Sequence, residues 1–149
     1  MELFGVVYTS VSTRSMTPAA LDNLLLVSRA KNAATGITGV LLYGDRRFFQ
    51  YLEGERDDVA QVYARICRSA AHTDLVELEY QQIPRRLFTQ WFMGFRKAPG
   101  SLLQQLNQQQ WARERPSADD HSAHSAGMRQ LMDFLDEDGA VDGSSATKS

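Results

Sequence analysis

The chain of 149 residues has room for one domain and a short extension, and 43% of its residues are hydrophobic, which is enough for a packed core. Its formal net charge of −2 gives no general electrostatic reason to bind nucleic acid or an anionic membrane. The only cysteine, Cys67, excludes an intrachain disulfide and a cysteine-rich metal site.

Signals for membrane insertion and export are missing from the sequence. No apolar run approaches the roughly 20 residues that a membrane helix needs. The first residues lack the basic start and long apolar stretch of a secretory signal. We therefore expect a cytoplasmic protein.

The first two predicted elements are a strand and a helix. Residues 2–10 alternate between two faces, with Tyr8 beside large apolar residues, and this period of two is typical of a strand. Thr17 followed by Pro18 predicts a helix start, with threonine as the N-cap and proline in the first turn. Apolar residues then recur at helical spacing, and the helix is predicted to end near Asn32.

A strand pair and a second helix are predicted next. Residues 36–43 form a dense β-type run, residues 44–47 a turn, and residues 48–53 a third strand in which Gln50 shares a face with apolar neighbours. The acidic residues 57–58 favour a helix start, because negative charge is stabilising at a helix N-terminus.

Two more strands complete the predicted sheet. Residues 75–83 form the fourth, which ends at Pro84, and residues 91–96 form the fifth, with Trp91 and Met93 on one face. The order strand-helix-strand-strand-helix-strand-strand predicts a ferredoxin-like α+β sandwich, in which a mixed five-stranded sheet has both helices on one face.

The composition changes after the fifth strand. Residues 102–111 form a glutamine-rich predicted helix, and residues 127–135 form a second short helix. We therefore predict a folded sandwich domain over residues 1–97, a helical extension over residues 98–138, and a disordered tail over residues 139–149, where small polar residues dominate.

Tyr8 and Gln50 are polar residues on apolar strand faces. If this side of the sheet faces the helices, both side chains point into the domain interior. A buried glutamine amide has two donors and two acceptor lone pairs, so it needs several partners. The pair can be a structural hydrogen bond within the core, or both residues can bind a ligand between the two helices.

Other candidate residues have ordinary structural explanations. Asn32 can cap the first helix, because asparagine tolerates left-handed backbone angles. Leu24 and Ile66 fit the buried stripes of the helices, and Trp91 and Met93 fit the alternate apolar positions of a strand. The sequence contains no Gly-rich phosphate loop after a strand, no His-Glu-x-x-His and no Gly-x-Ser-x-Gly, so the known motifs of common enzyme classes are missing.

Four segments form a specific combination. They are Val-Tyr-Thr-Ser at 7–10, Asn-Ala-Ala-Thr-Gly-Ile-Thr-Gly-Val-Leu-Leu-Tyr at 32–43, Phe-Phe-Gln-Tyr-Leu-Glu-Gly at 48–54 and Trp-Phe-Met at 91–93. In order and spacing this pattern resembles the BLUF family (blue light sensing using flavin), over residues 2–97. The resemblance implies a blue-light photoreceptor with a flavin between its two helices. FAD is the expected cofactor, with FMN and riboflavin as alternatives.

The resemblance also implies roles for the site residues. Tyr8 would be the photochemical electron and proton donor, and Gln50 the amide that rearranges between Tyr8 and the flavin N5/O4 edge. Asn32 would bond the flavin C4 carbonyl and N3 edge. Trp91 and Met93 would relay the change outward. The remaining cofactor contacts implied are Leu24 and Ile66 on the ring faces, Ser28, Arg65 at the ribityl or phosphate end, and Met93.

The sequence departs from the family pattern after the second helix. Many members carry an acidic and a basic residue there, where this chain has Ser69 and Ala71 and retains His72. This departure concerns the phosphate end of the ligand and leaves the preferred flavin open.

The resemblance implies a sensor and not an enzyme. Light would produce a reversible red-shifted state, which would be passed to a separate effector protein through the C-terminal helices or the sheet face, and a homo-oligomer is expected. The alternatives are a flavin-dependent oxidoreductase and a light-independent protein-interaction module.

Overall fold

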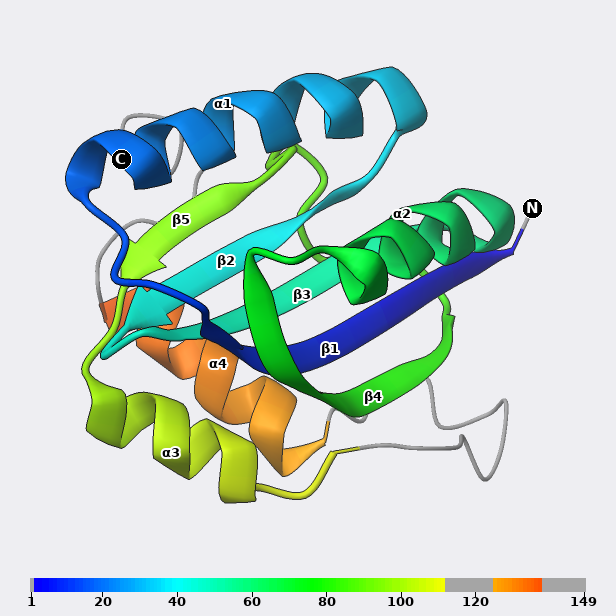
Figure 1. Cartoon of the computed structure of the whole chain (residues 1–149). Helices are drawn as coiled ribbons and strands as arrows, with labels where there is room; N and C mark the ends of the chain where they lie inside the picture. Colours follow the sequence, from blue (N-terminus) through cyan, green and yellow to red (C-terminus); the bar gives the residue numbers. More distant parts are fainter. Residues whose placement is uncertain (1, 112–124, 138–149) are drawn as a thin grey trace.

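A five-stranded sheet with helices on both faces forms the protein (Figure 1). The computed structural model describes residues 2–111 and 125–137. The elements along the chain are β1 (Leu3–Ser12), α1 (Pro18–Thr35), β2 (Thr38–Gly44), β3 (Arg47–Glu55), α2 (Arg56–Arg68), β4 (His72–Ile83), β5 (Gly94–Lys97), α3 (Gly100–Gln108) and α4 (Ala126–Glu137).

The strand order β4-β1-β3-β2-β5 confirms the predicted ferredoxin-like α+β fold. β1 is antiparallel to β3 and β4, β2 is antiparallel to β3, and β5 is parallel to β2, so the sheet is mixed. α1 and α2 cover one face of the sheet, and α3 and α4 lie on the other (Figure 1). None of the helices in the part of the chain that the structure describes is long and apolar enough to cross a membrane.

The N-terminus of α1 and the β2–β3 turn form as predicted. The hydroxyl of Thr17 accepts the N–H of Ala20, and Pro18 opens the helix. Asp45 and Arg46 form the turn with φ values of 50° and 61°, the left-handed angles that suit the twist of a two-residue hairpin.

The predicted end of α1 is wrong. The helix runs on to Thr35, and Gly36 is the left-handed residue, with a φ of 73° and its N–H donating to the carbonyl of Asn32. Glycine takes this conformation without the steric cost of a Cβ atom. Asn32 therefore remains helical, and its side chain does not cap the helix.

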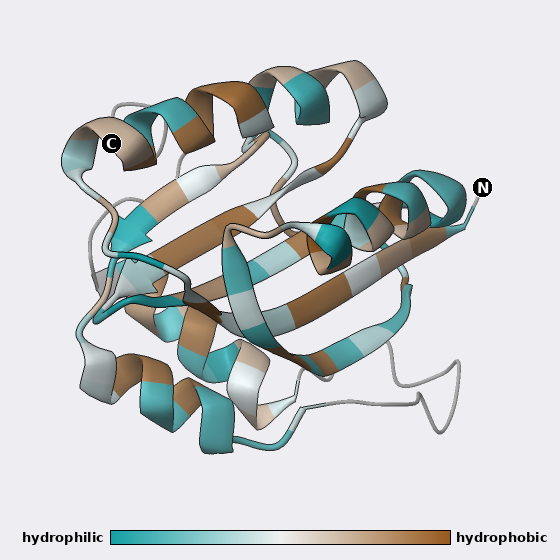
Figure 2. Ribbon diagram, viewed as in Figure 1, coloured by the Kyte–Doolittle hydropathy of each residue, from teal (hydrophilic) through white to brown (hydrophobic). Residues whose placement is uncertain are grey.

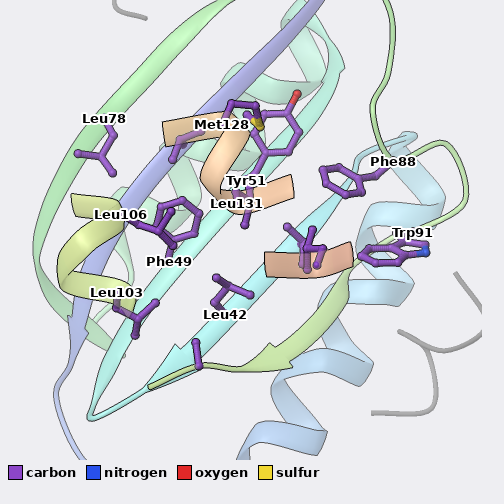
Figure 3. Close-up of a cluster of buried hydrophobic side chains, with 14 residues drawn as sticks. Leu42, Phe49, Tyr51, Leu78, Phe88, Trp91, Leu103, Leu106, Met128 and Leu131 are labelled. Carbon is purple, nitrogen blue, oxygen red and sulfur yellow. The ribbon is translucent and has the colours of Figure 1, made fainter. Parts of the chain in front are cut away.

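The sheet separates two hydrophobic cores. Figure 2 shows hydrophobic residues along β1, β2 and β3. The core under α1 and α2 includes Val6, Tyr8, Leu25, Leu41, Leu52, Val59 and Met93. The core under α3 and α4 includes Val7, Leu42, Phe49, Tyr51, Phe88, Trp91, Leu106 and Leu131 (Figure 3). α3 and α4 thus pack on the sheet face opposite α1 and α2. The predicted tail over residues 139–149 lies outside the described residues.

The predicted fifth strand is wrong in its first half. β5 contains only Gly94–Lys97, and Trp91 and Met93 precede it. Their side chains lie on opposite faces of the sheet, Trp91 in the core under α3 and α4 and Met93 in the core under α1 and α2. Strict alternation holds only within a regular ladder, which this segment lacks. Gly94 permits the arrangement, because a Cβ atom there would lie 2.3 Å from the Trp91 ring.

The packing of α4 predicts a large stability effect. Leu131 on α4 is 0% exposed, so Leu131→Ala should lower the free energy of unfolding by ~2–5 kcal/mol through lost burial and the remaining cavity. Leu26 on α1 is 68% exposed, and Leu26→Ala should cost less than about 0.5 kcal/mol. Urea unfolding measures both variants. Equal, small effects would contradict the packing of α4 on the sheet.

Candidate functional site

A cavity of about 280 Å³ lies between α1 and α2, with β1, β2 and β3 at its base. The cavity is lined by all but one of the cofactor-binding residues predicted from the sequence, namely Tyr8, Leu24, Ser28, Asn32, Gln50, Arg65 and Ile66. The exception is Met93. Trp91, predicted as a relay residue, lies on the other face of the sheet. The two helices and the inner strands therefore bring together residues that are far apart in the sequence.

A chain of hydrogen bonds runs along the base of the cavity. Tyr8 and Gln50 stand directly opposite each other in the β1–β3 ladder, so their side chains share a face. The Tyr8 hydroxyl donates to Oε1 of Gln50, and Nε2 of Gln50 donates to Sδ of Met93 at 3.3 Å. Tyr8 is 5% exposed and Gln50 is 7% exposed. Tyr8 and Gln50 therefore form the hydrogen bond expected of a structural pair, and both also line the cavity, as expected of ligand-binding residues.

Burial controls the protonation of Tyr8. Removal of the side chain from water raises the pKa of its hydroxyl, with a further contribution from Cys67. A tyrosine hydroxyl is neutral at ordinary pH, and the raised pKa extends this neutral form to more alkaline pH, so the group acts as a donor toward Gln50. Gln50 is the group that receives the hydrogen bond of this phenol.

Asn32 connects the cavity with the segment that precedes β5. It is 4% exposed, and its Nδ2 donates to the carbonyl of Phe92 at 2.6 Å. Its position on the last turn of α1 places it at the wall of the cavity. A ligand that bonds Asn32 would therefore act on the same side chain that holds Phe92.

The side walls carry apolar groups and cations. Leu24 on α1 and Ile66 on α2 line the cavity, as do Lys31 on α1 and Arg65 on α2. The sequence interpretation missed Lys31. Helical spacing contained the signal, because Lys31 follows Leu24 by seven residues and Ser28 by three, which places all three on one helix face.

His72, which lines the cavity, and Cys67 on α2 are two further reactive side chains. Nε2 of His72 lies 2.7 Å from the carbonyl of Ile66, so the imidazole binds the last turn of α2 while it lines the cavity. Cys67 is exposed. Within residues 2–111 and 125–137, no three His, Cys, Asp or Glu side chains gather as a metal site.

Comparison with known proteins decides the family. Residues 3–94 match the model of the BLUF family, described as sensors of blue light using FAD. The chain belongs to the BLUF family. BLUF domains bind flavin and are sensory modules. The resemblance inferred from the four sequence segments is confirmed.

Relatives of this BLUF protein include larger proteins. It is 34% identical over 86 residues to the photoactivated adenylate cyclase subunit beta of Euglena longa, and the matched region covers 58% of this chain and 10% of the relative. It is 32% identical over 68 residues to the blue light- and temperature-regulated antirepressor BluF of Escherichia coli (strain K12), and the matched region covers 46% of this chain and 17% of the relative. The chain thus spans a small part of these curated relatives.

A solved structure of similar size supports the BLUF fold. The BlsA ground state superposes with a TM-score of 0.66 at 25% sequence identity, and the match covers 91% of this chain and 86% of BlsA. The match extends well past residue 97, so it includes part of the C-terminal region.

The raised pKa of Tyr8 predicts its titration. Because burial raises this pKa above the ordinary tyrosine value of about 10, the alkaline absorbance titrations of the wild type and of Tyr8→Phe should coincide through pH ~10. Loss of one ionisation below that pH in Tyr8→Phe would contradict the buried, neutral phenol. Ultraviolet difference absorbance of the phenolate provides the measurement.

Proposed function

We propose that this BLUF protein is a blue-light photoreceptor in which Tyr8 and Gln50 read the state of a flavin bound between α1 and α2. The observation that carries the proposal is the hydrogen-bond chain from Tyr8 through Gln50 to Met93 at the base of a cavity between two helices. A phenol and an amide in this arrangement can exchange protons and hydrogen-bond partners without binding a substrate covalently.

The residues around the cavity fit a flavin. Leu24 and Ile66, from opposite helices, supply apolar groups for the two faces of the ring system. Asn32 and Gln50 supply amides for the polar edge of the ring, whose carbonyl and nitrogen atoms need donors and acceptors. On α1, Ser28 lies between Leu24 and Asn32.

The cations suit the other end of the ligand. Arg65 and Lys31 face the cavity from α2 and α1 and can bind a phosphate through charge-assisted hydrogen bonds. Ser69 and Ala71, which also line the cavity, supply no charge where many family members have an acid and a base. We therefore propose that FAD or FMN is held at its phosphate end chiefly by Lys31 and Arg65.

Tyr8 is the proposed electron and proton donor. A flavin excited by blue light supplies a strong oxidant. Tyr8 is the buried phenol on the cavity wall, and its hydroxyl already donates to Gln50, which gives the proton a path along that bond. Return of the electron and proton restores Tyr8, so the cycle consumes nothing.

Gln50 is the proposed switch. Its amide accepts from Tyr8 and donates to Met93, and rotation or tautomerisation exchanges these donor and acceptor positions. A donor turned toward the flavin carbonyl would strengthen that hydrogen bond and shift the absorption to the red. Two such arrangements differ by only ~1–3 kcal/mol, so the shifted state can be populated and can return thermally in the dark.

An oxidoreductase is the less supported alternative. It requires a base beside the reactive atoms and space for a substrate. Among the described residues that line the cavity there is no carboxylate. This set of side chains favours sensing over turnover.

The signal is proposed to leave through the segment before β5. Met93 contacts the switch, and Trp91, two residues earlier, packs in the core under α3 and α4. A movement of this segment would reach the far face of the sheet. We propose that this face and its helices bind a separate effector protein or a second copy of the chain.

The switch predicts a specific loss of photochemistry. Tyr8→Phe and Gln50→Leu should each bind flavin, because the apolar walls and the cations remain, but the reversible red shift under blue light should fall below about a tenth of the wild-type amplitude. Tyr63→Phe is the matched control, since the Tyr63 ring lies 5.9 Å from that of Tyr8. Light-minus-dark absorbance spectra measure the effect, and a normal shift in Tyr8→Phe would contradict the scheme.

The cations predict selectivity for phosphorylated flavins. Lys31→Ala and Arg65→Ala should each weaken FMN or FAD binding by about 10–100-fold, as expected for lost hydrogen bonds to a charged group. Riboflavin, which has no phosphate, should lose less than about threefold, and so should every flavin in the control Arg68→Ala. Fluorescence titration gives the dissociation constants. Equal losses for riboflavin and FMN would contradict a phosphate contact.

A further inference from the structure

Glu53 is a buried acid on the face of the sheet opposite the cavity. It is 0% exposed and follows Gln50 by three residues on β3, so alternation directs its side chain away from the cavity. Its Oε1 accepts from the Tyr51 hydroxyl at 2.9 Å and the Leu87 N–H at 2.8 Å. Its Oε2 accepts from the Thr38 hydroxyl at 2.9 Å and the Phe88 N–H at 2.6 Å. These four donors use the acceptor capacity of a carboxylate.

The neighbouring strands leave space for the Glu53 carboxylate and its donors. Glu53 is paired with Gly5 on β1 and with Thr38 on β2, so it stands in the middle of the sheet. A Cβ atom on Gly5 would lie 2.8 Å from the hydroxyl oxygen of Tyr51. Only glycine leaves room for this hydroxyl to reach the carboxylate.

Two of the four donors belong to the segment of residues 84–93, which connects β4 to β5. Leu87 and Phe88 donate through their backbone N–H groups, so the carboxylate holds the chain itself. The ring of Phe88 stacks on Trp91 with centroids 5.3 Å apart and planes 25° apart, and Figure 3 shows the two rings side by side. The first half of the segment is thereby attached to β3.

The second half of the segment is attached elsewhere. The carbonyl of Trp91 accepts from the N–H of Gly39, that of Phe92 accepts from Asn32, and that of Met93 accepts from Nε of Arg29 at 2.8 Å. These bonds lead to β2 and α1. The Glu53 carboxylate therefore anchors the first half of the segment to β3, next to a second contact in which Arg86 Nη1 donates to the Thr38 hydroxyl at 3.1 Å. Trp91 begins the second attachment through its own carbonyl.

We propose that Glu53 is a positioning residue of the light response, and that its carboxylate holds the 84–93 segment so that Met93 faces Gln50 while Trp91 remains buried under α3 and α4. The role rests on the proposed photoreceptor function. Glu53 touches neither the cavity nor the switch, and it acts through the backbone of Leu87 and Phe88.

Trp91 fluorescence tests this role in the full-length, flavin-loaded protein. The chain has two tryptophans, so Trp111→Phe leaves Trp91 as the only reporter. In this background Glu53→Gln presents an amide N–H₂ where two donors need an acceptor. We expect flavin binding to persist, while the acrylamide quenching constant of Trp91 in the dark rises about threefold or more as the segment detaches.

Glu79→Gln is the matched control for loss of a buried acid. Glu79 is 3% exposed and accepts from Gln81 and Ser125, which lie outside the 84–93 segment. Its substitution should leave Trp91 as shielded as in the parent. Equal Trp91 quenching in the Glu53→Gln and Glu79→Gln variants would overturn the proposal.

A milder variant covers the case in which Glu53→Gln does not fold. Thr38→Val removes one of the four donors to Glu53 and also the acceptor of Arg86 Nη1 in the same segment. It should raise Trp91 quenching in the same direction by a smaller factor; unchanged quenching would overturn the proposal. A parent protein without any red shift would instead contradict the proposed function. The dark-state measurement on Trp91 would then still decide whether Glu53 positions the segment.

Discussion

The hydrogen bond between Tyr8 and Gln50 is the interaction on which the rest of the site depends. It forms because β1 and β3 are paired in a register that sets these two residues opposite each other, with the polar groups turned toward α1 and α2. Burial keeps the phenol protonated, and the amide therefore has a fixed donor on one side and Met93 on the other. A ligand in the cavity would meet an amide whose orientation is set by these two neighbours.

β3 carries both the proposed switch, Gln50, and the proposed anchor, Glu53. Along β3, Gln50 and Leu52 line the cavity, while Tyr51 and Glu53 point to the opposite face. The two faces meet again in the 84–93 segment, because Met93 contacts Gln50 and Phe88 binds Glu53. The segment Gln-Tyr-Leu-Glu-Gly thus makes side-chain hydrogen bonds on both sides of the sheet.

Regular periodicity predicted the fold, and the resemblance to the BLUF family supplied most of the residues of the cavity wall. Alternation in the strands predicted that Tyr8 and Gln50 lie on apolar strand faces, and helical spacing could also have revealed Lys31. Periodicity failed at Trp91 and Met93, since the segment before β5 leaves the ladder and a glycine lets the tryptophan ring cross to the other face. The role of Glu53 could not be predicted, because its partners Leu87 and Phe88 contribute backbone N–H groups, which leave no mark in the sequence.

The central claim is that light rearranges hydrogen bonds at the flavin edge through Gln50 and turns over no substrate. Light-minus-dark infrared difference spectroscopy of the flavin-loaded protein tests it most directly. Our account predicts that the flavin C4 carbonyl stretch moves to lower frequency under blue light, because its hydrogen bond strengthens, and that it returns fully in the dark without any added reductant or oxidant. A carbonyl band that does not move, or a change that persists until a redox partner is added, would contradict it.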